Sequence, residues 1–204
     1  ITTQDGMTIK PFVLIRTDAL GWLTPLGCEQ FAALNIKTVI DVRSDSEFHN
    51  YPDPPCVKYI VTHLHIPMST FGNEPTMEDA YVYLFRHSPE SIRRFFEVIS
   101  DPNNLPVLYH CQIGKDRVGI LSALICRLLN VNDAIIVEDY LISRQTGYGA
   151  EPEWIEAVLE EVDASGGIEA YLSSIGVTNE MMERVRRNVL EEPAGVRGWR
   201  SYSS

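Results

Sequence analysis

The sequence predicts an α/β protein with a central, mostly parallel β-sheet flanked by helices and a helical C-terminal part. Short runs of β-branched and apolar residues alternate with stretches of helical periodicity, as in a sheet covered by helices. No linker or internal repeat divides the 204 residues, and 45% of them are hydrophobic, which is enough for one core. We therefore expect a single domain over residues 1–190 and a loosely held tail over residues 191–204.

The N-terminal half carries three strand signals. The run from Lys37 to Val42 is rich in β-branched residues and predicts a buried strand whose end presents Asp41 and Arg43. Apolar residues at helical spacing predict the helices. In chain order we expect a strand at 12–16, a helix at 25–34, a strand at 37–42, a loop at 44–55, a strand at 59–66, and helices at 76–85 and 89–99.

The C-terminal half starts with one strand, at residues 106–109, and then becomes helical. Asn132 or Asp133 is a suitable N-cap for one helix, and Thr178 is suitable for the last. In a sheet of this kind the loops at the carboxyl ends of the strands form the binding crevice. The helices expected in this half lie at 117–129, 132–143, 151–162 and 178–190.

The passage from the strand at 106–109 into the next helix carries the chemistry. His110 and Cys111 follow the strand, and five residues separate Cys111 from Arg117. The positive end of the helix favours a thiolate at Cys111, and the planar fork of Arg117 can hold two oxygens of a phosphoryl group during attack by sulfur. The backbone N–H groups that can converge on the phosphate are those of Gln112, Ile113, Gly114, Lys115, Asp116 and Arg117.

The string HCQIGKDRVG at residues 110–119 contains the cysteine phosphatase signature His-Cys-x5-Arg. It resembles the HCxxGKDRTG loop of the atypical tyrosine phosphatases called tyrosine phosphatase family 3, which act on protein and lipid phosphates. Three other stretches, at 38–44, 137–143 and 171–178, agree with that family, so the resemblance covers roughly residues 12 to 190.

The resemblance implies a tyrosine-phosphatase-like catalytic domain over residues 1–190 with the single-domain cysteine phosphatase fold. It implies that Cys111 is the nucleophile of a phosphocysteine mechanism, that Arg117 clamps the phosphate, and that no cofactor or metal takes part. The expected substrate is a phosphorylated protein, with phosphotyrosine or dual specificity, or a small phosphorylated molecule. Members usually have Ser or Thr after the arginine, whereas this chain has Val118, which predicts slower breakdown of phosphocysteine.

The general acid is expected to be Asp116, because relatives with the KDR sequence use the aspartate of the loop. Asp116 must then carry a proton beside cations, and an ion pair that shapes the loop is the alternative. Asp79 and Asp53 are lesser candidates. The remaining expectations are that Lys115 adds charge to the pocket, that His110 orients Cys111, and that Asp41 and Arg43 give support, Arg43 partly at the pocket rim.

Composition limits the partners and the compartment. The formal net charge of −11 argues against nonspecific binding to nucleic acid or to an anionic membrane. No apolar run is long enough to span a bilayer, and no signal-peptide pattern is present. Four cysteines make no disulfide framework, and a catalytic thiolate needs reducing conditions, so we expect a cytoplasmic protein of undefined oligomeric state. Cys126 is expected in the core, and Cys28 or Cys56 could trap oxidised Cys111.

Other functions fit parts of the sequence. A phosphoinositide or small-metabolite phosphatase would use the same loop, and Val118 is compatible with a pseudophosphatase that only binds phosphate. The segment DVRSDSEF at 41–48 resembles rhodanese sulfurtransferases, which also use a cysteine loop. Rhodanese loops commonly have a shorter spacing between the cysteine and the cationic residue than that between Cys111 and Arg117. Asp41 also lies farther from Cys111 than is usual in rhodaneses. Both differences argue against sulfur transfer. No His/Cys/Asp group has the spacing of a metal site, and His63 and His65 are expected to be strand residues.

Overall fold

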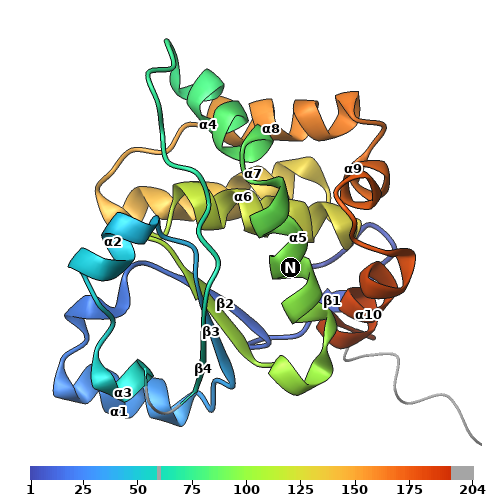
Figure 1. The fold of residues 1–204 in the computed structure, drawn as a ribbon. Coiled ribbons are helices and arrows are strands. Elements are labelled where there is room, and N and C mark those ends of the chain that lie inside the picture. The colour runs from blue at the N-terminus through green and yellow to red at the C-terminus, as the bar shows by residue number, and fades with distance from the viewer. Residues whose placement is uncertain (59–60, 194–204) are drawn as a thin grey trace, which may run out of the picture.

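A parallel sheet of four strands, in the order β2-β5-β3-β4, forms the centre of the computed structural model, which describes residues 1–58 and 61–193 (Figure 1). The register places Asp41 opposite both His65 and His110, so three strands end together at one edge. The strands are β2 (Leu14–Thr17), β3 (Thr38–Asp41), β4 (Thr62–His65) and β5 (Val107–His110).

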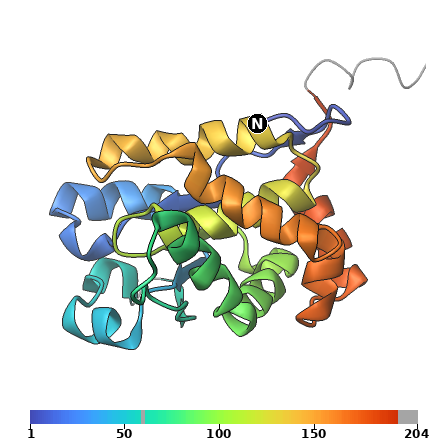
Figure 2. The same cartoon turned by 90° about the horizontal axis from the view of Figure 1, so that it is seen from above.

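Helices cover both faces of this sheet. Neighbouring residues of a strand point to opposite faces, so Val39 packs in a small cluster with Phe31 and Val57, whereas Ile40 packs in the large cluster. The small cluster is covered by η1 (Leu20–Trp22), α1 (Pro25–Ala33) and α3 (Pro55–Lys58). Figure 2 shows these blue and cyan segments at one end of the molecule and the red C-terminal helices at the other.

The helices that pack in the large cluster come from the rest of the chain. Burial of one Leu, Ile or Phe side chain stabilises a fold by roughly 1.5–3 kcal/mol, so this side of the sheet supplies most of the core. The helices that contribute are α4 (Met77–Arg86), α5 (Pro89–Ser100), α6 (Asp116–Leu128), α7 (Asp133–Leu141), α8 (Pro152–Ala164), α9 (Ile168–Ser174) and α10 (Asn179–Val189), with the short turns η2 (Pro102–Asn104) and η3 (Ile142–Thr146) between them.

The predicted fold class is confirmed, and the expected strands and long helices are present to within a few residues. The segment 44–55, predicted as a loop, instead contains α2 (Asp45–Asn50) and the start of α3. The sequence analysis also omitted α9 and a two-stranded antiparallel sheet of β1 (Thr8–Ile9) and β6 (Leu190–Glu191). Glu191, the first residue of the predicted tail, pairs with Thr8 in this sheet; residues 194–204 of that tail lie outside the described residues.

Two of the four cysteines form a structural disulfide, whereas the sequence had indicated no disulfide framework. Cys28 in α1 and Cys56 in α3 are joined, because the two helices pack together although 28 residues separate the cysteines. The idea that either one traps oxidised Cys111 is therefore wrong in this structure. A disulfide is typical of oxidising compartments, which runs against the predicted reducing one. None of the helices in the described ranges is long and apolar enough to cross a membrane.

Candidate active site

The loop between β5 and α6 lies at the carboxyl edge of the sheet, and glycine is required at its apex. Gly114 has a φ of +75°, which favours glycine, and a Cβ at this position would lie 2.7 Å from the backbone nitrogen of Asp18. The Ala19 N–H donates to the carbonyl of Gln112 at 3.3 Å. The chain that follows β2 therefore holds the loop from outside and fixes its curvature.

Cys111 begins this loop and is buried, with 1% of its surface exposed. The backbone N–H of Gly114 donates to the Cys111 sulfur at 3.3 Å. An N–H that points at sulfur stabilises a negative charge there, as does the N-terminus of α6, which starts five residues later. The local geometry thus suits a thiolate.

Arg117 lies in the first turn of α6, where its guanidinium forms a two-pronged ion pair with Glu47 of α2. Nη1 donates to Oε2 at 2.5 Å, and Nη2 donates to Oε1 at 2.8 Å. Burial alone lowers the pKa of Arg117, but the hydrogen bond that Arg117 donates to Glu47, together with the nearby Cys111, outweighs burial and leaves the pKa raised. The predicted phosphate clamp is therefore a fixed cation whose fork is oriented from outside the loop.

Glu47 is itself held by the start of α2. The backbone N–H and the hydroxyl of Ser44 both donate to Glu47 Oε2 at 2.8 Å, and the Glu47 N–H donates to Ser44 Oγ, so the two residues form a capping box. Burial raises the pKa of Glu47, but the hydrogen bond and charge of Arg117, together with Ser44, lower it to about 2. Glu47 is thus a carboxylate at neutral pH.

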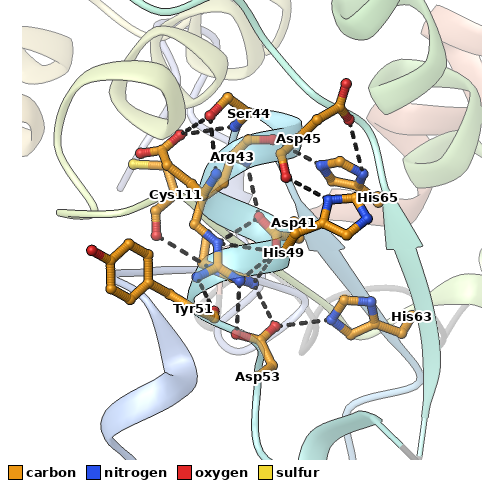
Figure 3. Close-up of polar contacts among 12 residues, drawn as sticks. Asp41, Arg43, Ser44, Asp45, His49, Tyr51, Asp53, His63, His65 and Cys111 are labelled. Carbon is orange, nitrogen blue, oxygen red and sulfur yellow. Dashed lines mark hydrogen bonds and ion pairs between the residues drawn. The ribbon is translucent and has the colours of Figure 1, made fainter.

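Beneath the loop, a fully buried arginine joins two carboxylates (Figure 3). Arg43 donates from Nε and Nη2 to Asp41, from Nη2 to Asp53 at 3.1 Å, and from Nη1 to the carbonyl of Tyr51 at 2.8 Å. Burial lowers the pKa of Arg43, but the hydrogen bond and charge of Asp41 and the charge of Asp53 outweigh burial and raise it. Arg43 therefore supports the site from within the core. It was also predicted to lie partly at the pocket rim, but it is fully buried and is not among the residues that line the pocket.

Asp53 connects this arginine to two histidines. Its Oδ2 is 3.1 Å from Nε2 of His110 and 2.9 Å from Nε2 of His63. With Asp41, these residues offer four potential metal ligands within 4.8 Å of one another, a grouping that sequence spacing did not indicate. Both carboxylates already accept from the Arg43 guanidinium. The carboxylates of Asp41 and Asp53 are therefore paired with the guanidinium of Arg43, and they are not a free pair of carboxylates for a metal ion.

Asp116 faces the pocket and lies at the end of a buried chain of hydroxyls. The Tyr81 hydroxyl donates to Asp116 Oδ1 at 2.5 Å and is 2.6 Å from the Tyr140 hydroxyl. Burial, together with the adjacent Asp116, raises the pKa of Tyr81 far above its usual range. In the hydrogen bond between Tyr81 and Asp116 the tyrosine hydroxyl is therefore the donor, and it orients the carboxyl group of Asp116.

The ammonium group of Lys115, which was predicted to add charge to the pocket, donates to backbone carbonyls. Its Nζ donates to the carbonyls of Tyr148 and Gly149 at 3.1 and 3.0 Å and lies 4.9 Å from the centre of the Trp154 ring. It also lies 3.2 Å from Asp116. Lys115 thus anchors the segment before α8 to the loop.

A pocket of about 300 Å³ opens in front of the loop. Its wall combines apolar side chains with the charged groups described above, and Phe71 packs beside Tyr81 with ring centres 6.1 Å apart. The lesser acid candidates Asp53 and Asp79 are not among the lining residues; Asp53 is held in the buried network, and Asp79 accepts a hydrogen bond from the hydroxyl of Thr76, the N-cap residue of α4. The residues that line the pocket are Glu47, Thr70, Phe71, Leu84, Gln112, Ile113, Asp116 and Arg117.

Three further residues of the site were not predicted from the sequence, namely Glu47, Tyr81 and Phe71. A signal for Glu47 was present, because Ser44-x-x-Glu47 is the spacing of a capping box and predicts a helix start directly after the strand at 38–41. Tyr81 and Phe71 had no such signal. Tyr81 reaches the site only through the packing of α4 across α6, and Phe71 contacts the ring of Tyr81; both are tertiary contacts.

A parallel sheet with a Cys-x5-Arg loop at its carboxyl edge defines a cysteine-based phosphatase. The family model described as "Tyrosine phosphatase family" matches residues 1–191, so the chain belongs to the tyrosine phosphatase family. A tyrosine-protein phosphatase of Nostoc commune is 28% identical over 214 residues, which cover 84% of this chain and 72% of the relative.

Solved structures share the fold. The core catalytic domain of the PP-IP phosphatase SIW14 from S. cerevisiae, in complex with citrate, aligns with a TM-score of 0.50 and 18% identity, covering 88% of this chain and 97% of that domain. TpbA of P. aeruginosa aligns with a TM-score of 0.42 and 17% identity over 80% of this chain and 86% of that one. The SIW14 alignment agrees with the single-domain α/β architecture.

We predict that Glu47→Gln lowers the free energy of unfolding at neutral pH by about 2 kcal/mol, because the buried Arg117 fork loses its anion. The folded pKa of Glu47 is about 2, below the ordinary 4.5, so this stabilisation is present above about pH 5 and disappears as the pH falls toward 2. Urea unfolding of both proteins across this range measures it.

Glu161→Gln provides the matched control, because Glu161 forms the same two-pronged pair with Arg86 at the surface. Its loss should cost less than about 1 kcal/mol. Equal losses in the two variants, or a Glu47 effect that does not change with pH, would contradict the assigned importance of the buried pair.

Proposed function

We propose that the protein hydrolyses phosphate monoesters through a phosphocysteine at Cys111 and that its substrates are phosphotyrosine residues of proteins, with dual specificity as a wider form of the same activity. The observation that carries the proposal is that the loop and the first turn of α6 hold a buried sulfur, which accepts a hydrogen bond from the Gly114 N–H, and the oriented fork of Arg117, which lines the pocket. This set can bind a phosphoryl group and supply a nucleophile at the same time.

In the first step the Cys111 thiolate attacks phosphorus, an S–P bond forms, and the P–O bond to the leaving group breaks. The electron pair of that bond goes to the leaving oxygen, which takes a proton from the carboxyl group of Asp116. The loop N–H groups and Arg117 stabilise the charge on the phosphoryl oxygens. Asp116 is favoured as the acid because it lines the pocket, whereas Asp53 and Asp79 do not.

In the second step water attacks phosphocysteine, the S–P bond breaks, and the thiolate of Cys111 leaves with its electron pair. Asp116, now a carboxylate, accepts the proton of the water, and phosphate is released. Gln112 also lines the pocket, and its buried Oε1 has no hydrogen-bond partner among the described residues. That oxygen can accept a hydrogen bond from the attacking water.

The pocket wall favours an aromatic phosphate. Phe71, Leu84 and Ile113 provide apolar surface beside the loop, which suits the ring of phosphotyrosine. Among the described lining residues Arg117 is the sole cation, and Glu47 and Asp116 oppose it. One cation in an acidic pocket matches a single phosphate group.

Phosphoinositides and small phosphorylated metabolites are the second candidates. They are considered because SIW14, whose fold is similar, is a PP-IP phosphatase. A ligand with several phosphates needs several cations, and the ammonium group of Lys115, which could have supplied one, is bound to backbone carbonyls instead. We therefore propose phosphotyrosine as the preferred substrate over these molecules.

Cys111→Ser should abolish turnover of an aryl phosphate while phosphate still binds, because the serine hydroxyl is a poor nucleophile here and the oxyanion contacts remain. The control is Cys126→Ala: burial raises the pKa of the Cys126 thiol to about 12, so it is inert, and its loss should spare activity. Release of aryl alcohol and phosphate titration by calorimetry measure both properties. Hydrolysis retained in Cys111→Ser would exclude the covalent mechanism.

Asp116→Asn should slow hydrolysis of alkyl phosphates far more than hydrolysis of aryl phosphates with good leaving groups. General acid catalysis contributes about 10²–10⁴-fold when the leaving oxygen needs a proton, and much less when it does not. Steady-state kinetics on a leaving-group series tests this, with Asp79→Asn as the control for a carboxylate in the first turn of α4, outside the pocket. Equal losses on all substrates would assign Asp116 to loop structure alone.

Val118 predicts an accumulating intermediate. Stopped-flow assays of the wild-type protein should show a stoichiometric burst of aryl alcohol followed by a slower steady state, because no hydroxyl at position 118 assists the departing thiolate. Val118→Thr should raise the steady-state rate up to about tenfold, as one charge-assisted hydrogen bond allows, whereas Val118→Ala should not. Absence of a burst together with no gain in Val118→Thr would refute this interpretation.

A further inference from the structure

One oxygen of the Asp116 carboxyl group is fully engaged by the protein. The Tyr81 hydroxyl donates to Oδ1 at 2.5 Å, and the ammonium nitrogen of Lys115 lies 3.2 Å from the same atom. Such an oxygen has two lone pairs, so these two donors saturate Oδ1. No hydrogen bond to Oδ2 is present among the described residues, although the Asp116 side chain lines the substrate pocket. The two oxygens of this carboxyl group are therefore not equivalent.

Tyr81 can act only as a hydrogen-bond donor toward Asp116. Its hydroxyl is also 2.6 Å from the Tyr140 hydroxyl, and a phenol carries one proton. Because Tyr81 gives its proton to the bond with Asp116, Tyr140 must donate to the Tyr81 oxygen. Burial is the largest cause that raises the pKa of both phenols, so both keep their protons at neutral pH. This chain of hydrogen bonds thus has a fixed direction, from Tyr140 to Asp116.

Packing holds the two tyrosines against the start of α6. Both rings are buried, and they meet edge to face with centres 5.9 Å apart. Tyr140 comes so close to α6 that a Cβ at Gly119 would lie 3.2 Å from its ring carbon Cδ2. The ring of Trp154 lies 5.8 Å from that of Tyr81 and 4.9 Å from Nζ of Lys115. Both donors to Oδ1 therefore belong to one packed unit, which is already in place before the reaction starts.

We propose, on the basis of the function proposed above, that Tyr81 is a positioning residue that makes Oδ2 the oxygen of Asp116 that carries the transferred proton. In the protonated carboxyl group, Oδ1 is then the carbonyl oxygen, which accepts from Tyr81 and Lys115, and Oδ2 is the hydroxyl oxygen. When the P–O bond of the substrate breaks, its electron pair goes to the leaving oxygen, which takes the proton from Oδ2. The electron pair of the O–H bond stays on the carboxylate.

The donors to Oδ1 favour this transfer because their hydrogen bonds become stronger as it proceeds. A hydrogen bond to an ionised oxygen is shorter and stronger than one to a neutral carbonyl oxygen. Asp116 becomes ionised only as the proton leaves, so Tyr81 stabilises the transition state more than the ground state. The gain is largest for a poor leaving group, which needs the proton most. Tyr81 is not among the residues that line the pocket, and it acts on the substrate through Asp116.

Tyr81→Phe tests this assignment, because the change removes one hydroxyl and keeps the ring. The kcat for an alkyl phosphate should fall about tenfold, whereas the kcat for an aryl phosphate with a good leaving group, and KM for both, should change less than about twofold. In the Asp116→Asn background, Tyr81→Phe should have no further effect on kcat, because the group through which it acts is gone. Steady-state kinetics of the wild type, the two single variants and the double variant measure this cycle.

Tyr171→Phe is the matched control. Tyr171 is also a buried tyrosine that packs on α4, with its ring centre 4.4 Å from that of Phe85, but its hydroxyl has no hydrogen-bond partner among the described residues. Its loss should leave kcat unchanged for both substrates. Equal losses on alkyl and aryl phosphates in Tyr81→Phe, or an undiminished loss in the Asp116→Asn background, would refute the role of Tyr81. Hydrolysis retained in Cys111→Ser would instead refute the proposed function, so the two failures are distinguished.

A crystal structure of Cys111→Ser with bound phenyl phosphate tests the geometry without any change at position 81. The ester oxygen should lie within about 3.2 Å of Oδ2 of Asp116, while Tyr81 and Lys115 remain on Oδ1. An ester oxygen bound to Oδ1, or a Tyr81 hydroxyl turned away from Asp116, would overturn the proposal, including the case in which Tyr81→Phe does not fold.

Discussion

The site depends on the pairing of the buried Arg43 guanidinium with two buried carboxylates. The guanidinium lies at the carboxyl edge of the sheet, fully removed from solvent, and is paired with Asp41 and Asp53. Leaving any member of such a group without its partner costs several kcal/mol, so the three side chains hold their elements in one arrangement. Asp41 ends β3, and Asp53 follows α2, so this single cluster fixes how α2 meets the sheet.

The position of α2 in turn orients the arginine that we propose as the phosphate clamp. Glu47 of α2 orients the Arg117 fork, and the carbonyl of Arg43 accepts a hydrogen bond from His65 of β4 at 2.8 Å. The segment at 41–48 that resembles rhodanese therefore serves the phosphatase site as its support. Preorganised donors of this kind need no rearrangement when charge develops in the transition state, which is the physical basis of their catalytic effect.

Sequence reasoning found the parts of the site that are local in the chain. The strand, the loop from Cys111 to Arg117 and the helix that follows are contiguous, so their pattern predicted both the fold class and the anion cradle. The partners of these residues are distant in sequence: Glu47 lies 70 residues from Arg117, and Asp53 lies 57 residues from His110. Periodicity and spacing carry no information about such contacts. The same limit hid the Cys28–Cys56 disulfide and the contacts of Lys115 with Tyr148 and Gly149.

A crystal structure of the protein with vanadate tests the central claim most directly, namely that Cys111, the loop N–H groups and Arg117 act together on one phosphoryl group. The account predicts vanadium bonded to the sulfur of Cys111, its equatorial oxygens bound by the loop N–H groups and by Arg117, and Glu47 still paired with that arginine. Vanadate bound away from Cys111, or an Arg117 that turns from the oxyanion and leaves Glu47, would contradict it.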